Sequence, residues 1–276
     1  MKQKAKTQTI SRRGFIALLL AAGASITAAG LIWRDSYNFR INRQRIKIAN
    51  LQEKIKIAQL TDFHYGEFVK EKDLEKWIDA CIAEKPDLVL ITGDFIDSST
   101  TEFDGIIRQL SRLSAPLGAY GVWGNHDYNA GSMRKRFEQE LNNIGIEILV
   151  NSGKEIREDI YLLGVDDLYN GKPDIKQALI NKPQDSVSLH MSHNPDYLFN
   201  IPKTIDFSFC GHTHGGQVKL PIIGAPYIPS AYGNKFIGGL VNTPTKAFVS
   251  KGLGFTGLPI RFNARAEIII FELLPS

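Results

Sequence analysis

Side chains that commonly bind metals gather in five short motifs along this chain of 276 residues. Each motif follows a short apolar run, and five of the six histidines lie in the motifs. Imidazole, carboxylate and amide donors without a thiolate suit a catalytic first-row divalent metal and argue against a structural zinc site. In chain order the motifs are Asp62-Phe63-His64, Gly93-Asp94, Gly124-Asn125-His126-Asp127, Ser192-His193-Asn194 and Gly211-His212-Thr213-His214.

The spacing within two of the motifs predicts paired ligands. Successive side chains of an extended chain alternate between its two faces, so Asp62 and His64 are predicted to point the same way. The same argument applies to His212 and His214. Open α/β sheets bind ligands at the carboxyl ends of their strands, so the five motifs are predicted to converge on one crevice.

The segments that carry these motifs have the patterns of an α/β fold. Apolar residues at helical spacing predict helices over 74–82, 103–110 and 133–141. Short apolar and β-branched runs predict strands over 55–60, 88–92, 119–123, 146–150, 160–165, 187–191, 205–210, 247–251 and 267–273. We therefore expect two packed mixed β-sheets flanked by helices.

The distribution of charge separates the first part of the chain from the rest. Residues 1–47 carry ten basic residues and one acidic residue, whereas the rest carries 23 basic and 28 acidic residues. An acidic body argues against nonspecific nucleic-acid binding, which needs a clustered basic face, so no nucleic-acid partner is expected. Cys81 and Cys210 lack the spacing of a redox or zinc motif and are interpreted as buried free thiols.

The first segment has the features of an export leader. Arg12-Arg13 precedes twenty uncharged residues, 14–33, as in a twin-arginine signal. A plain membrane anchor is the alternative, because about 20 apolar residues span a bilayer, and cleavage remains open. We predict an exported bacterial protein, anchored to the membrane or on the envelope side. Its predicted parts are a signal peptide or anchor over 1–33, a basic linker beside the membrane surface over 34–45, and one domain over 46–276.

The ordered motifs Asp-x-His, Gly-Asp, Gly-Asn-His-Asp, His and Gly-His-Thr-His resemble those of the calcineurin-like metallophosphoesterase superfamily. The resemblance extends from about Ile55 to Leu274 and implies a metallophosphoesterase-like β-sandwich. Together with the leader, it makes the chain similar to the exported YaeI/YkuE-like phosphodiesterase branch. The chain also resembles the related UDP-2,3-diacylglucosamine pyrophosphatases.

The resemblance implies a role for each motif residue. It implies that His126 faces the scissile phosphate and protonates the leaving oxygen, and that Asp127 fixes the His126 ring. One metal ion is expected on Asp62, His64 and His214. A second is expected on Asn125, His193 and His212, with Asp94 bridging the two.

These residues predict a hydrolase that needs two divalent metal ions, with manganese favoured over iron, zinc or cobalt. A hydroxide that bridges the two ions is the expected nucleophile. The expected activity is that of a cell-envelope phosphodiesterase, and the alternative is a pyrophosphatase for a lipid-linked nucleotide sugar. A non-catalytic scaffold is a third reading, which the complete set of ligands disfavours. The apolar segment 221–229 is either a packed surface loop or a rim that contacts lipid.

Overall fold

Two six-stranded β-sheets pack face to face and share one apolar core. The computed structural model describes residues 12–276, and within the first helix it describes only some of the side chains. The first sheet has the order β1 (Phe39–Ile48), β12 (Ala266–Pro275), β2 (Ile55–Leu60), β3 (Leu88–Ile91), β4 (Ala119–Gly121) and β5 (Ile146–Ile148). The second has the order β10 (Gly239–Asn242), β11 (Lys246–Val249), β9 (Phe207–Cys210), β8 (Val187–Met191), β7 (Ile160–Gly164) and β6 (Ser152–Arg157).

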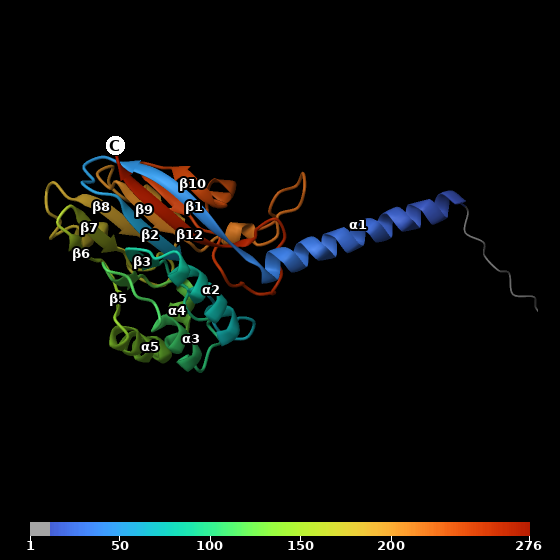
Figure 1. Ribbon diagram of the computed structural model, residues 1–276, viewed down its shortest axis with the longest axis horizontal. Coiled ribbons are helices and arrows are strands. Elements are labelled where there is room, and N and C mark those ends of the chain that lie inside the picture. Colours follow the sequence, from blue (N-terminus) through green and yellow to red (C-terminus); the bar gives the residue numbers. More distant parts are fainter. Residues whose placement is uncertain (1–11) are drawn as a thin grey trace, which may run out of the picture.

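Helices cover the outer face of each sheet (Figure 1). Trp77 and Phe137 are among the helical side chains packed on the first sheet. That sheet is covered by α2 (Glu71–Ala83), α3 (Asp104–Leu110), α4 (Asn125–Asn129) and α5 (Ser132–Asn143). The second is covered by α6 (Ile175–Ala178) and the short 3₁₀ helices η1 (Pro195–Phe199) and η3 (Gly233–Phe236). Central strands such as β3 are therefore buried on both faces, which explains their continuous apolar sequence.

The parallel strands set the position of the motifs. In the first sheet β2, β3, β4 and β5 run parallel, and in the second β7, β8, β9 and β11 run parallel. The carboxyl ends of parallel strands lie at one edge of a sheet. Each sheet therefore delivers its motifs to a common edge, as the sequence predicts.

The predicted α/β class, the three predicted helices and the nine predicted strands are confirmed, with ends that differ by a few residues. The predicted linker over 34–45 is wrong, because β1 begins at Phe39 and pairs in parallel with β12. The arginines of β1 contact acidic side chains, with Arg40 at 2.8 Å from Glu267 and Arg45 at 2.7 Å from Glu272. Strands β6 and β10 were not predicted either.

A long helix, α1 (Arg12–Tyr37), leads from the predicted leader into β1 and projects from the body (Figure 1). Residues 1–11, where that leader starts, lie outside the described residues. Among the described residues, no helix combines the length and the apolarity needed to cross a bilayer. The C-terminal end of α1 is joined to the body, because Asp35 Oδ2 accepts a hydrogen bond of 2.6 Å from the Asn263 amide.

The core contains one histidine outside the five motifs. His190 lies within β8, fully buried, with Nδ1 at 3.0 Å from Ser208 Oγ and with no hydrogen-bond partner for Nε2 in the described structure. Burial lowers the pKa of His190 from 6.5 to about 3. His190 is therefore a core residue that lies apart from the five motifs.

We expect His190 to make folding sensitive to acid. Below pH 6.5 the unfolded chain gains a proton at His190 that the folded chain does not accept until about pH 3, so stability falls as the pH drops through this window. His190→Gln should reduce the pH slope of the free energy of unfolding by up to about 1.4 kcal/mol per pH unit. Urea unfolding at about pH 7 and about pH 5 measures the slope. Ser208→Ala, which keeps the imidazole, should retain the slope of the wild type, and equal slopes for His190→Gln and the wild type would contradict the assignment.

Candidate metal centre

The predicted site residues meet where the carboxyl ends of the two sheets adjoin. Asp62 and His64 follow β2, Asp94 follows β3, His193 follows β8, and His212 follows β9. The motif after β4 forms the short helix α4, and His214 begins the 3₁₀ helix η2 (His214–Gly216). Donor atoms from these residues form overlapping groups within 4.8 Å of one another.

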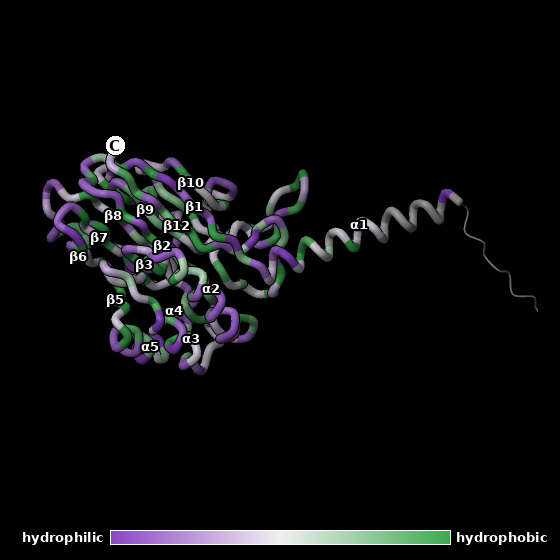
Figure 2. The backbone as a smooth tube through the Cα atoms, viewed as in Figure 1, coloured by the Kyte–Doolittle hydropathy of each residue, from purple (hydrophilic) through white to green (hydrophobic). Residues whose placement is uncertain are grey.

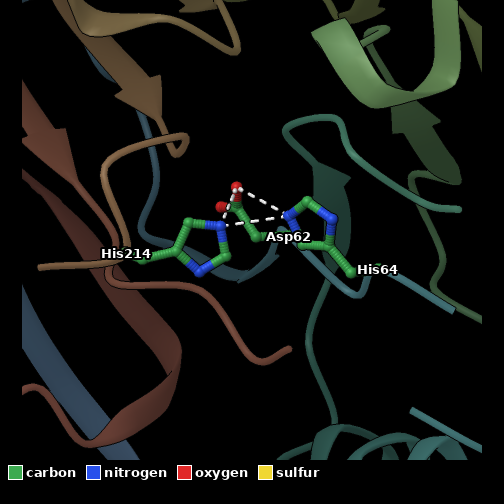
Figure 3. Close-up of side chains that lie close together, drawn as sticks. All are labelled: Asp62, His64 and His214. Atoms are coloured by element: carbon green, nitrogen blue, oxygen red, sulfur yellow. Dashed lines mark hydrogen bonds and ion pairs between the residues drawn. The ribbon is translucent and has the colours of Figure 1, made fainter. Parts of the chain in front are cut away.

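The first group consists of Asp62, His64 and His214, whose side chains point toward one another (Figure 3). Nε2 of His64 lies 3.0 Å from Nε2 of His214. Oδ1 of Asp62 lies 3.4 Å from His214 Nε2 and 4.0 Å from His64 Nε2. All three side chains are buried, so a cation at their centre would be shielded from bulk water.

The second group consists of Asp94, His193 and His212, with Asn125 beside it. Nε2 of His193 lies 3.1 Å from Asp94 Oδ2, 3.1 Å from His212 Nδ1 and 3.2 Å from Asn125 Oδ1. The other ring nitrogen of His193 lies 2.8 Å from the carbonyl oxygen of Thr92, which fixes the ring and leaves Nε2 facing the group.

Asp94 connects the two groups. Its Oδ2 lies 3.4 Å from His64 Nε2 in the first group and 3.1 Å from His193 Nε2 in the second. Its Oδ1 accepts a hydrogen bond of 2.8 Å from the backbone amide of His126. This carboxylate can therefore contact cations in both groups at once.

The backbone brings these donors together in a different way from the one that the sequence suggests. Five of the seven predicted ligands have a positive φ, between 48° and 74°: Asp62, His64, Asp94, His212 and His214. Extended alternation is therefore the wrong explanation for their convergence, although the pairs do converge. Left-handed residues turn the chain sharply after each strand, and such sparsely populated conformations cluster at functional sites. Gly124 permits the Asp94 carboxylate to lie close to the backbone, since a Cβ at position 124 would lie 2.2 Å from Asp94 Oδ1.

Burial and mutual charge perturb the ionisable groups. Burial raises the pKa of Asp62 to about 6 and lowers the pKa of His64 to about 4. Burial would also lower the pKa of His193, but the Asp94 carboxylate outweighs it and raises that pKa to about 10. The pKa of His212 falls to about 3 because of burial. Buried imidazole nitrogens and carboxylates that face common centres form a donor set that fits two divalent cations, and a cation bound by His193 would replace the proton that Asp94 stabilises there.

A cavity of about 450 Å³ opens over both groups. Its walls include His126 and Thr256 together with an apolar side formed by Tyr169, Val218, Pro226, Tyr227 and Pro229. The Tyr169 ring lies edge-on to His212, with 5.3 Å between the ring centroids. A substrate can therefore place an anionic group on the donor set and an apolar or planar group against this wall.

His126 is positioned differently from the sequence prediction. Nδ1 of His126 lies 3.1 Å from Ser98 Oγ. The buried Asp127 carboxylate instead accepts backbone hydrogen bonds of 2.9 Å from Gly124 and 3.1 Å from Ile96. The prediction that Asp127 fixes the His126 ring is therefore wrong, because the helical turn of α4 directs the carboxylate to the backbone. Burial raises the pKa of Asp127 to about 8.

Two residues at the centre were not assigned to it from the sequence. Thr256 Oγ1 lies 2.9 Å from His214 Nε2 and 3.5 Å from His64 Nε2. Arg261 is fully buried, and its Nη2 lies 2.6 Å from the Gly254 carbonyl oxygen and 3.1 Å from His214 Nδ1. The Arg261 guanidinium therefore holds the His214 ring from its Nδ1 side. The glycine-rich segment around Gly254 is the signal that could have indicated these contacts.

A family model described as calcineurin-like phosphoesterase matches residues 55–216, more than half of the chain and all seven predicted ligands. The chain belongs to the calcineurin-like phosphoesterase family. As a member of that family it is a metallophosphoesterase, a hydrolase of phosphoesters, and the resemblance inferred from the motifs is confirmed.

Several calcineurin-like relatives match nearly the whole chain. The chain is 32% identical to the uncharacterized metallophosphoesterase YkuE of Bacillus subtilis, over 96% of this chain and 98% of that protein. It is 29% identical to the phosphodiesterase YaeI of Escherichia coli, over 96% of this chain and 100% of that protein. A solved dimetal phosphatase from Danio rerio aligns with 72% of this chain and 88% of its own, at 13% identity and a TM-score of 0.45.

Proposed function

We propose that the protein is a phosphodiesterase that uses two divalent metal ions at the centre described above. The observation that carries this proposal is the position of Asp94, whose Oδ2 lies between His64 of the first group and His193 of the second. A carboxylate shared in this way fits a pair of neighbouring cations.

Each group would hold one ion. One ion would bind Asp62, His64 and His214, the other would bind Asn125, His193 and His212, and Asp94 would contact both. Two such ions lower the pKa of a shared water molecule and neutralise the charge that develops on the phosphoryl oxygens. Arg261 contributes by holding the His214 ring from its Nδ1 side, at 3.1 Å.

His126 supplies the proton for the leaving group. Its Nδ1 is engaged by Ser98 Oγ, which leaves the Nε2 edge available to donate a proton to the departing oxygen. The backbone amide of His126 donates to Asp94 Oδ1, which holds the backbone of His126 beside the donor set, and Ser98 contacts the ring. Asp127 supports this arrangement indirectly, since its hydrogen bonds hold the backbone at Gly124.

A diester is favoured over a monoester by the shape and lining of the cavity. A diester carries a second substituent on phosphorus, and the wall formed by Tyr169, Tyr227 and Pro226 offers an apolar surface for it. The relative named phosphodiesterase YaeI supports the same substrate class. A pyrophosphatase for a lipid-linked nucleotide sugar is the second candidate, because the same wall suits a base or an acyl chain.

We also propose manganese as the natural metal and the cell envelope as the location. Divalent affinity generally rises from manganese toward copper, so a chain that folds before export would bind manganese inside the cell, away from the zinc and copper outside. The location rests on Arg12-Arg13 and the uncharged residues that follow them. Metal analysis of protein purified from the envelope tests the first point, and finding zinc alone would contradict it.

A substrate panel tests the proposed activity. With manganese added, turnover of bis(p-nitrophenyl) phosphate should exceed that of p-nitrophenyl phosphate by at least about tenfold, a difference of about 1.4 kcal/mol in activation free energy. A chelator should abolish turnover, and added manganese should restore it. Faster hydrolysis of the monoester would overturn the proposal, whereas faster hydrolysis of nucleoside diphosphate sugars would favour the second candidate.

A further inference from the structure

One part of the sequence differs sharply in charge from the rest of the body. Residues 207–266 contain six basic residues and no Asp or Glu. The other residues after position 47 contain 17 basic and 28 acidic residues, since 23 minus 6 is 17. The three segments considered below, 33–37, 217–227 and 256–263, expose no carboxylate, because Asp35 is buried and paired with Arg34.

Within this stretch a short hairpin turn presents apolar side chains to solvent. Backbone hydrogen bonds of 2.8 and 2.9 Å between Leu220 and Gly224 close the turn. Ile222 at its tip is fully exposed, and the neighbouring Ile223 is 76% exposed. Figure 2 shows hydrophobic colour at the tip of a loop that projects on the same side of the body as α1.

The backbone conformation of Ile222 indicates that its exposed side chain contacts a partner. Its φ is 68°, in the left-handed region, where a β-branched residue is a genuine outlier. Glycine would adopt this conformation without a steric cost. For isoleucine this conformation has a steric cost. Because Ile222 is fully exposed, packing within the described chain does not compensate for that cost. The side chain is therefore suited to a partner outside the chain.

The hairpin is tied to the end of α1 through Asn263. Asn263 Nδ2 donates to the carbonyl oxygen of Lys219 at 3.0 Å, and the Asn263 amide donates to Asp35 Oδ2 at 2.6 Å. The Lys219 amide also donates to the carbonyl oxygen of Phe262 at 2.8 Å. These hydrogen bonds place the three segments next to one another, and each segment carries exposed apolar or aromatic side chains. We call them the docking face: Trp33, Tyr37, Leu220, Ile222, Ile223 and Leu258.

We propose that the docking face inserts into the interface of an anionic lipid bilayer. Aromatic residues that flank exposed aliphatic side chains are typical of membrane interfaces. The exposed Lys219 and the lack of exposed carboxylates on these segments complement anionic headgroups. The face is a protruding tip, which suits a fluid bilayer better than a rigid protein surface. Val218 and Tyr227, which flank the hairpin in the sequence, line the cavity, so a substrate with an apolar tail would reach the donor set from a bilayer at this face.

A fluorescent label at the tip tests the insertion in the full chain. The native Cys81 and Cys210 are buried, so Ile222→Cys can be labelled selectively with a polarity-sensitive dye. The control is Ile180→Cys, which is 75% exposed and follows α6, a helix that contacts β6 and β7. Phosphatidylglycerol vesicles should shift the emission of the label at position 222 to the blue and leave the label at position 180 unchanged.

Every other outcome of this measurement overturns the proposal. An unchanged label at position 222 in protein that sediments with the vesicles would mean that another segment binds the lipid. A blue shift that depends on protein concentration without vesicles would mean that the tip contacts a second copy of the chain. Equal shifts at both positions would mean nonspecific adsorption.

A second measurement separates this proposal from the proposed activity. The double variant Ile222→Ser/Ile223→Ser should bind phosphatidylglycerol vesicles at least about tenfold more weakly, whereas Ile180→Ser should bind like the wild type. Both variants should hydrolyse a soluble diester at the wild-type rate, which also shows that they are folded. Unchanged vesicle binding by the double variant would overturn the docking proposal. Failure of the wild type to hydrolyse diesters would overturn only the proposed activity.

Discussion

His126→Ala is expected to lower turnover of a diester by about 10²–10⁴-fold while both metal ions remain bound. The imidazole lines the cavity, and its Nδ1 contacts Ser98 Oγ, so we propose its Nε2 edge as the proton donor for the leaving oxygen. His126 also lies close enough to His64 and Asp94 to form a third group of donors. The two groups proposed to hold the ions are complete without it, since Asp62 has two other histidines beside it and Asp94 has His193 and His212. Steady-state kinetics and metal analysis of the same preparation measure both quantities.

The leaving group provides the control for this role. An aryl leaving group with a low pKa needs little help from an acid, so the loss in His126→Ala should be larger for an alkyl diester than for a nitrophenyl diester. Ser98→Ala removes the contact at Nδ1 but keeps the imidazole, and its loss should be smaller. An equal loss for both leaving groups, or release of metal from His126→Ala, would refute the proton-donor role.

Asp94→Asn is expected to abolish activity for a different reason, the loss of metal. Its carboxylate lies between His64 and His193, and the substitution removes one negative charge from both groups while keeping the shape of the side chain. Changes to residues that merely support a ligand weaken metal binding 10–100-fold, so loss of the shared carboxylate should exceed about 100-fold. Titration of the metal-free protein with manganese measures the affinity and the number of sites.

Asp127→Asn is the matched control for Asp94→Asn. Asp127 is equally buried, but its carboxylate accepts hydrogen bonds from the backbone amides of Gly124 and Ile96. The control should therefore bind two manganese ions with an affinity close to that of the wild type. If Asp94→Asn also binds two ions with unchanged affinity, Asp94 does not bridge them, and the arrangement proposed for the centre is wrong.

The junction between the leader and the body belongs to the fold rather than to a linker. Asp35 and Ser36 hydrogen-bond to the backbone of Asn263 and Arg261, and β1 follows directly after them. Arg261 in turn contacts His214 in the metal centre. If a peptidase removes the leader, a cut that leaves Asp35 and Ser36 in place preserves these contacts.

The sequence by itself determined the family, the class of fold and the candidate donor residues that the structure brings together. These features are encoded locally, because strand and helix patterns repeat over a few residues and donors such as Asp62 and His64 directly follow the strands that carry them. Even so, the local argument from extended chain was wrong, because backbone conformations with positive φ bring the donors together.

Tertiary structure alone decided which distant groups complete the centre. Thr256 and Arg261 reach His214 from more than 40 residues away, and β1 pairs with β12 across most of the chain. Likewise, Ser98 rather than Asp127 contacts His126, because the turn of α4 directs the Asp127 carboxylate to the backbone. Such contacts depend on how whole sheets and loops pack against one another, and residue spacing within a single segment does not predict that packing.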